Sequence, residues 1–178
     1  MIEPVFFDTD CLSAFLWVDN QSLLALLYPG RIVIPAEVYA ELSLPSIRQL
    51  KAKVDSMVTS SFARIEHLQV GTEEYKLYRK LVSNPDSGHV IIGDGEAASI
   101  ALAKEKGGVL ASNNLSDISV YVKEFHLKHV TTGDILKEAL QKGFISEMQG
   151  NQLWQEMLNK HRRLGYASFT EFLESNKD

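Results

Sequence analysis

Four carboxylates hold equivalent places in the pattern of this chain. Asp8 and Asp117 follow apolar runs, whereas Glu41 and Glu96 lie within or at the start of predicted helices. Acids that converge at one edge of a sheet repel each other, and a divalent cation with oxygen ligands offsets that repulsion. The set therefore predicts a site for Mg²⁺ or Mn²⁺ and, with it, hydrolysis of phosphate esters.

The composition is typical of one domain in a reducing compartment. A chain of 178 residues, 45% of them hydrophobic, is long enough for one core and short for two full domains. Its one cysteine, Cys11, excludes a disulfide framework and a multi-cysteine zinc site. The N-terminal residues lack the positive charge of a signal peptide, and no apolar run approaches the roughly 20 residues of a membrane span. We therefore expect a cytoplasmic protein without membrane contact.

Apolar strand-like runs alternate along the chain with segments of helical periodicity. The pattern predicts strands over 5–7, 31–34, 63–68, 109–111 and 128–131. It predicts helices over 12–17, 21–28, 35–42, 46–60, 73–81, 96–106, 115–125, 132–143, 147–165 and 168–175, with Asp94 as the N-cap of the sixth. Such alternation favours a three-layer α/β/α fold around a mostly parallel sheet of four to five strands, followed by a helical C-terminal tail.

The predicted topology places the acids on one edge of the sheet. In parallel open sheets, ligands bind beyond the carboxyl ends of the strands. Asp8, Asn113 and Asn114 fall at that edge, and Glu96 begins a helix that should face it. Taken singly, each acid has a simpler explanation, because Asp often caps a helix and Glu often faces solvent. The set as a whole favours one shared site.

Four segments resemble the motifs of PIN-domain nucleases. FFDTDCLSAF is similar to the opening of that family, IPAEVYAEL to its second motif, GDGEAASIALA to its third and GGVLASNNLSDI to its fourth. The segment GDILKEALQKGFIS resembles a C-terminal part of bacterial members. The resemblance covers nearly the whole chain through the order and spacing of these parts. It implies a nuclease domain over 1–145 and a helical extension over 146–178 that packs on it.

The resemblance also implies an activity and partners. The expected function is metal-dependent hydrolysis of phosphodiester bonds in single-stranded RNA, with 5′-phosphate and 3′-hydroxyl products. Many such ribonucleases are the toxin half of a toxin–antitoxin pair, so we expect an antitoxin protein and a homodimer as partners. Asp8, Glu41 and Glu96 match the family's metal-site acids.

The fourth motif departs from the family pattern. Where many relatives have an Asp after the fourth strand, this chain has Asn113 and Asn114, whose amides still offer a carbonyl oxygen. Asp117 lies about one helical turn beyond Asn114 and would supply the missing charge. Asp94 is a further candidate metal ligand from the other side of the site.

Substrate contacts must come from local groups, because the net charge of −5 argues against generic capture of nucleic acid. Our candidates combine hydroxyls beside Asp8, the Asn pair and basic residues of a predicted helix. They are Thr9, Ser13, Asn113, Asn114, Arg48 and Lys51.

Two alternatives use the same residues differently. The segment DTD at 8–10 also resembles the start of haloacid-dehalogenase-type phosphatases, in which Asp8 would attack phosphorus. Leu12 and Ala98 depart from that pattern, and Glu41 has no role in it.

The other alternative is a catalytically silent PIN-like protein that binds a partner. The Asn pair motivates it, together with a set of tryptophans and methionines that could form a docking surface, namely Trp17, Trp154, Met148 and Met157.

Overall fold

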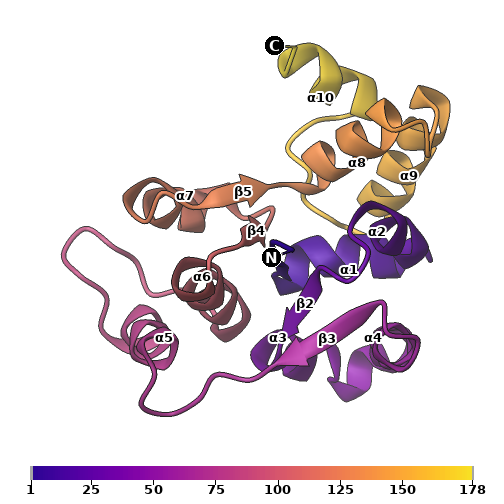
Figure 1. The fold of residues 1–178 in the computed structure, drawn as a ribbon. Helices are drawn as coiled ribbons and strands as arrows, with labels where there is room; N and C mark the ends of the chain where they lie inside the picture. The colour runs from indigo at the N-terminus through magenta and orange to yellow at the C-terminus, as the bar shows by residue number, and fades with distance from the viewer. Residues whose placement is uncertain (1, 178) are drawn as a thin grey trace.

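A five-stranded sheet forms the centre of the molecule (Figure 1). The computed structural model describes residues 2–177. The strands are β1 (Val5–Phe7), β2 (Ile32–Pro35), β3 (Ala63–Glu66), β4 (Val109–Ala111) and β5 (Lys128–Val130). They pair in the order β3-β2-β1-β4-β5, and every pairing is parallel. The predicted sheet is confirmed.

Strands β1, β2 and β4 are buried on both faces. Phe6 contributes to one hydrophobic core, while its neighbours Val5 and Phe7 contribute to the other. The same alternation divides Val33 from Ile32 and Ile34. Because successive side chains of a strand point to opposite faces, continuous apolar runs such as VFF and IVI require a layer of helices on each side.

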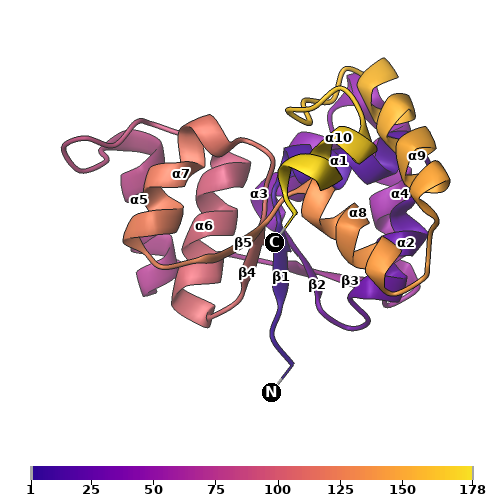
Figure 2. The same ribbon diagram turned by 90° about the horizontal axis from the view of Figure 1, so that it is seen from above.

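Helices form those two layers, which Figure 2 shows on either side of the sheet. The helices are α1 (Thr9–Trp17), α2 (Gln21–Leu27), α3 (Ala36–Leu42), α4 (Arg48–Thr59), α5 (Glu73–Ser83), α6 (Asp94–Lys106), α7 (Leu115–Glu124), α8 (Thr132–Gln141), α9 (Glu147–Asn159) and α10 (Phe169–Ser175), with a 3₁₀ turn at Pro45–Ile47. One layer contains α5, α6 and α7, and the other contains α1, α2, α4, α8, α9 and α10. The predicted three-layer fold is therefore confirmed.

Two predicted helix ends are wrong. Asp94 is not the N-cap of α6, because Gly93 takes that place and Asp94 is the first helical residue. The helix predicted over 147–165 ends at Asn159, after which His161 adopts a left-handed conformation with φ 58°. The N–H of Arg162 then donates to the carbonyl of Met157 at 3.0 Å and closes the helix. No Gly or Pro marks this end, so the sequence pattern continues through it.

The C-terminal helices share the core of the sheet. Trp154 of α9 and Phe169 of α10 are fully buried in the same cluster as Phe7 and Phe15. The indole N–H of Trp154 donates to the carbonyl of Tyr166 at 3.0 Å, which satisfies its one polar atom. Helices α9 and α10 therefore pack against the rest of the chain, while the boundary at residue 145 stays a prediction.

The helices are too short for a bilayer. Across residues 2–177, none of them combines the length and apolar character that a membrane crossing requires.

Gly150 of α9 lies against an aromatic ring. A Cβ at this position would overlap the ring of Phe169, which is fully buried and has no room to move. We expect Gly150→Ala to lower the free energy of unfolding by about 1–3 kcal/mol, because overpacking outweighs the roughly 1 kcal/mol by which Ala favours a helix. Urea unfolding measures the change. Met148→Ala on the same helix is the control, since Met148 is 82% exposed; equal stability of both variants would contradict the packing of α10 on α9.

Candidate active site

Asp8 occupies the centre of the predicted site. It follows β1, and its N–H donates to the carbonyl of Ala111 in β4 at 3.0 Å, which ties the residue to the sheet edge. As N-cap of α1, its Oδ1 accepts a hydrogen bond from the N–H of Cys11 at 2.7 Å. Its Oδ2 is buried and has no hydrogen-bond partner among residues 2–177. One carboxylate oxygen is therefore free to bind another group.

The surroundings of Asp8 favour its neutral form. The residue has 0% exposure, and this burial raises the pKa of Asp8 to about 7. Asp10 and Glu96 raise the pKa further through their charges, while the hydroxyl of Ser112 and the N–H of Cys11 lower it. A buried carboxylate in this state gains from a bound cation, which would replace the lost hydration.

Glu41 reaches the same edge from α3. The hydroxyl of Thr9 donates to Glu41 Oε2, and the N–H of Gly95 donates to Glu41 Oε1 at 2.9 Å. Position 95 favours Gly, because a Cβ there would lie 2.7 Å from Thr9 Oγ1 and 2.9 Å from Glu41 Oε2 and would displace these side chains. The start of α6 thus approaches α3 closely, which explains how a mid-helix Glu joins the site.

Asn114 joins the remaining two acids. Its Nδ2 donates to Glu96 Oε1 at 2.6 Å and to Asp117 Oδ2 at 2.8 Å. Its Oδ1 accepts from the hydroxyl of Ser116 at 2.8 Å. The amide therefore presents its donor, not its carbonyl oxygen, to the acids, and the carbonyl of Asn113 likewise accepts from the N–H of Thr132 at 2.8 Å.

Opposing effects also act on the pKa of Glu96. Burial raises the pKa of Glu96 above its usual value, and the charge of Asp117 adds to this effect. The amide of Asn114 lowers the pKa by donating to the carboxylate. The Asn side chain thus donates hydrogen bonds to two carboxyl groups without adding a negative charge of its own.

A cavity of about 210 Å³, the acidic cavity, opens among these groups. Its lining residues come from the carboxyl end of β1, from α3 and from the start of α6; they are Asp8, Thr9, Asp10, Glu41, Gly93 and Glu96. Asp10 was not among the predicted site residues, although its spacing of two from Asp8 was visible in the sequence. Three predicted acids and one additional acid therefore face a single cavity.

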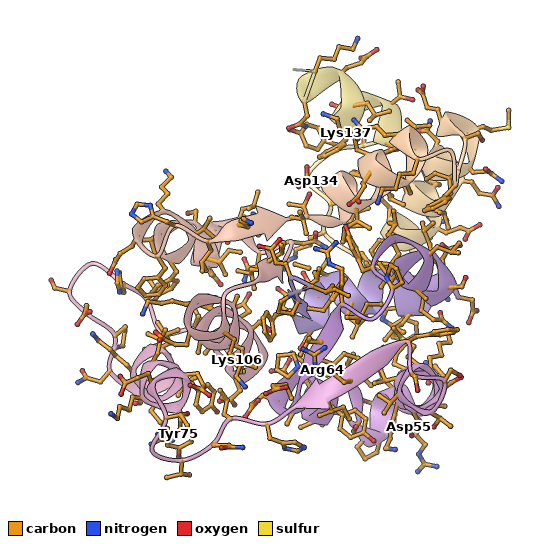
Figure 3. The ribbon with its side chains drawn as sticks, in the orientation of Figure 1. Asp55, Arg64, Tyr75, Lys106, Asp134 and Lys137 are labelled. Atoms are coloured by element: carbon orange, nitrogen blue, oxygen red, sulfur yellow. The ribbon has the colours of Figure 1, made fainter. Side chains whose placement is uncertain are left out.

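The other predicted residues lie outside the acidic cavity. Asp94 is exposed, and its Oδ1 accepts from the hydroxyl of Tyr78 at 2.7 Å. Lys51 forms an ion pair of 2.6 Å with Asp55, which Figure 3 labels on α4. Arg48 lies exposed at the start of the same helix.

Ser13 is also occupied within the protein. This residue is buried, and its hydroxyl donates to the carbonyl of Asp10 at 3.1 Å.

The acids of the cavity stand apart from one another. Within residues 2–177, one group of three possible metal ligands has all its ligand atoms within 4.8 Å of one another. It consists of Asp86, His89 and Glu124. That group lies between the loop before α6 and the end of α7, away from the acidic cavity. Glu41 and Glu96 instead accept hydrogen bonds from different groups. Thr9 and Gly95 donate to Glu41, and Asn114 donates to Glu96.

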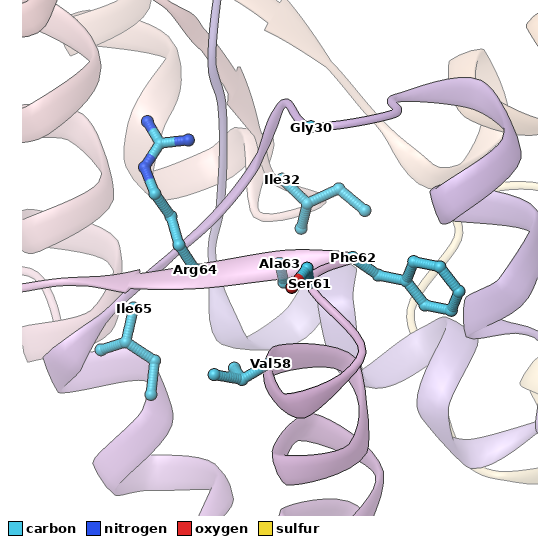
Figure 4. Close-up of a pocket in the computed structure, with 8 residues that line it drawn as sticks. All are labelled: Gly30, Ile32, Val58, Ser61, Phe62, Ala63, Arg64 and Ile65. Carbon is cyan, nitrogen blue, oxygen red and sulfur yellow. The ribbon is translucent and has the colours of Figure 1, made fainter.

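One large hollow lies away from the acids. It measures about 510 Å³ and is lined by Ile32, Phe62, Ala63 and Arg64, at the amino ends of β2 and β3 (Figure 4). The acids follow the carboxyl ends of β1 and β4, where parallel sheets bind their ligands. We therefore take the acidic cavity as the candidate site.

Comparison with known proteins relates the chain to one family. A family model, DUF3368, described as a PIN domain, matches residues 4–178. No curated protein matches the chain. The crystal structure of VapBC2 from Rickettsia felis bound to a DNA fragment from their promoter is similar, with a TM-score of 0.50 and 19% sequence identity. The match covers 71% of this chain and 97% of that one, and at this identity it concerns the fold.

The burial of Asp8 predicts a pH-dependent stability. The pKa of Asp8 rises from 3.8 to about 7 on folding, so the folded state keeps a proton that the unfolded chain loses near pH 4. The contribution of Asp8 to the free energy of unfolding is at its full value below that pH. It falls by about 1.4 kcal/mol per pH unit until the pH passes the pKa of the folded state. With EDTA present, Asp8→Asn should therefore gain about 2–3 kcal/mol relative to the wild type between about pH 5 and pH 8.

Urea unfolding of both proteins at the two pH values measures this difference. If the free energies of unfolding of the two proteins changed with pH in parallel, Asp8 would already be ionised in the folded protein. Glu105→Gln serves as the control, because Glu105 is exposed on α6 and should leave the profile unchanged.

Proposed function

The chain belongs to the PIN domain family, and on that premise we propose that it is a divalent-metal-dependent nuclease that hydrolyses single-stranded RNA. PIN domains are typically nucleases that use divalent metals. One observation carries the proposal: the buried Asp8 carboxylate has an oxygen without a partner in a cavity lined by three further acids. A cavity with this charge suits a cation better than any neutral ligand.

The residues of the acidic cavity fit Mg²⁺ or Mn²⁺. Their donors are carboxylate oxygens, the ligands that these hard cations prefer. Asp8 would be the central ligand, Glu41 and Glu96 would complete the coordination or position the attacking water, and Asp117 would act directly or through water. Asp10 adds charge at the same cavity. Asp94 bonds to Tyr78 instead, and we assign it no ligand role.

The chain's own groups prepare this site for hydrolysis. Thr9 and the N–H of Gly95 orient Glu41, and Asn114 orients Glu96 and Asp117. A bound divalent ion supplies Lewis-acid chemistry, which polarises a phosphodiester and lowers the pKa of a water molecule. Hydrolysis then places the water oxygen on phosphorus and releases 5′-phosphate and 3′-hydroxyl ends. No side-chain nucleophile is required.

We also propose that an antitoxin protein is the partner. The similar structure is a VapBC2 assembly bound to promoter DNA, and the family match extends the same fold to this chain. A homodimer and a cytoplasmic location remain parts of the proposal.

A partner-binding protein without catalysis is the second candidate. Asn114 favours it, because a neutral residue stands where many relatives carry an acid. Two of the proposed docking residues, Trp154 and Met157, are fully buried in the core and do not support it, whereas Met148 is 82% exposed. The phosphatase alternative is weaker still, because the chain belongs to another family and Asp8, its required nucleophile, has no exposed surface.

Metal binding separates these candidates. Calorimetry should detect Mn²⁺ binding to the wild type and not to Asp8→Asn, because the substitution removes the central charge. The wild type should then cleave single-stranded RNA on a gel, and Asp8→Asn should not. Glu105→Gln is the matched control, being an exposed acid on the helix that carries Glu96. Absence of Mn²⁺ binding to the wild type at millimolar metal would favour the partner-binding protein.

Asn114→Asp tests the departure from the family pattern. The change replaces two donated hydrogen bonds by a third negative charge beside Glu96 and Asp117, so the metal-free protein should lose about 1–3 kcal/mol of stability. Mn²⁺ affinity should rise, because a further hard oxygen ligand becomes available. Calorimetry and urea unfolding in EDTA measure both effects. A fall in Mn²⁺ affinity would mean that the amide bridge is needed to place the two acids.

A further inference from the structure

A second, larger hollow adjoins the acidic cavity. It measures about 580 Å³ and has the loop residues 161–163, between α9 and α10, on its lining together with Asn114 and Ser116 from the start of α7. Asp10 lines both this hollow and the acidic cavity, so the two lie next to each other at that residue. We call it the basic hollow, because the loop supplies His161, Arg162 and Arg163.

Arg162 fixes the loop to the acidic edge. Its guanidinium lies 3.7 Å from Asp10 Oδ1 and donates to the hydroxyl of Ser13 at 3.4 Å. Its Nε donates to the carbonyl of Lys160 at 2.9 Å. The side chain is half-buried, so its charge balances Asp10 and is not available to a ligand without breaking these contacts.

Arg163 has a different environment. Its side chain is exposed, and within residues 2–177 it forms neither a hydrogen bond nor an ion pair. It lines the basic hollow and also a neighbouring one of about 290 Å³ that reaches Asn113 and Tyr166. A guanidinium offers five donors in a planar fork that matches the oxygens of a phosphate.

The neighbouring groups are compatible with an anion. Asp10 is the one acid of residues 2–177 that lines this hollow. The hydroxyl of Ser116 and the amide of Asn114 also line it, but they already form hydrogen bonds to each other and to Asp117. Asp10 is itself faced by Arg162. In a chain with net charge −5, this unpaired arginine gives a polyanion a local attraction beside the cluster of acids.

We propose that the basic hollow binds a backbone phosphate of the nucleic-acid strand, next to the bond that lies at the acidic cavity. Arg163 contacts the phosphate, and Arg162 positions the loop through its ion pair with Asp10 and its hydrogen bond to Ser13. The proposal rests on the proposed function, because it requires a strand that crosses the acidic cavity. It assigns substrate binding to a loop in the C-terminal part of the chain, in place of Arg48 and Lys51 on α4.

Strand binding without cleavage tests this proposal. The probe is a fluorescein-labelled single-stranded RNA of about ten nucleotides, the length that such sites accommodate. Fluorescence anisotropy in EDTA at low ionic strength measures its affinity for the wild type, Arg163→Gln, Arg163→Lys and Arg64→Gln, and a gel verifies that the strand stays intact. Arg64, which Figure 4 labels, is the control: an exposed arginine on β3, at the opposite edge of the sheet from β5, that pairs with Glu66 at 3.8 Å.

Arg163→Gln should weaken binding by about fivefold and reduce the slope of log affinity against log salt by about 0.7, the loss of one phosphate contact on a single strand. Arg163→Lys should retain the salt slope and part of the affinity, because it keeps the charge and loses the fork. Arg64→Gln should match the wild type. Thermal unfolding should be unchanged in all variants, since both arginines are exposed.

The outcomes separate this proposal from the proposed nuclease function. Equal affinities of Arg163→Gln and Arg64→Gln would overturn the phosphate site, as would a wild type that does not bind the strand at all. Neither result concerns Mn²⁺ binding, which calorimetry measures at the acidic cavity. Conversely, loss of RNA affinity in Arg163→Gln would support the phosphate site even if the wild type bound no Mn²⁺.

Discussion

The arrangement of this protein depends on one buried carboxyl group. Asp8 ends the first strand, caps the first helix and holds a carboxylate oxygen that no group in residues 2–177 satisfies. Burial of such a group costs free energy unless it is neutral or paired, and its raised pKa expresses that cost. A residue that only capped a helix would be better placed at the surface. Its position makes sense if binding a cation is worth more than stability in the unbound state.

The other acids are held apart by donors. Thr9 and the N–H of Gly95 bind Glu41, while the amide of Asn114 binds Glu96 and Asp117. These hydrogen bonds allow several carboxylates to share one edge of the sheet without an ion. They also explain why Gly suits position 95, where the start of α6 comes within contact distance of Glu41. The neutral Asn114 is thus part of the architecture of the site, whatever it does to metal affinity.

The C-terminal helices contribute in two ways. Trp154, Phe169 and Phe172 complete the core against the layer that contains α1. Because α9 ends at Asn159, the loop that follows it turns towards the acidic edge, where Arg162 meets Asp10. The same turn after α9 therefore brings α10 against the core and places Arg162 beside Asp10. The extension is a part of the site's surroundings, not an addition to the outside of the domain.

The sequence by itself determined the sheet, its two helical layers and the acids that begin or follow their elements. These depend on short apolar runs, on helical periodicity and on the order of the elements along the chain, all of which can be read locally. Only the tertiary structure decided that Glu41 meets Gly95, that Asn114 presents its donor to the acids, and that Asp94 turns to Tyr78. The end of α9 and the approach of residues 161–163 to Asp10 were likewise beyond the pattern, which contains no stop signal there. Such contacts join residues far apart in the chain, and their geometry depends on how whole helices pack, which no local spacing encodes.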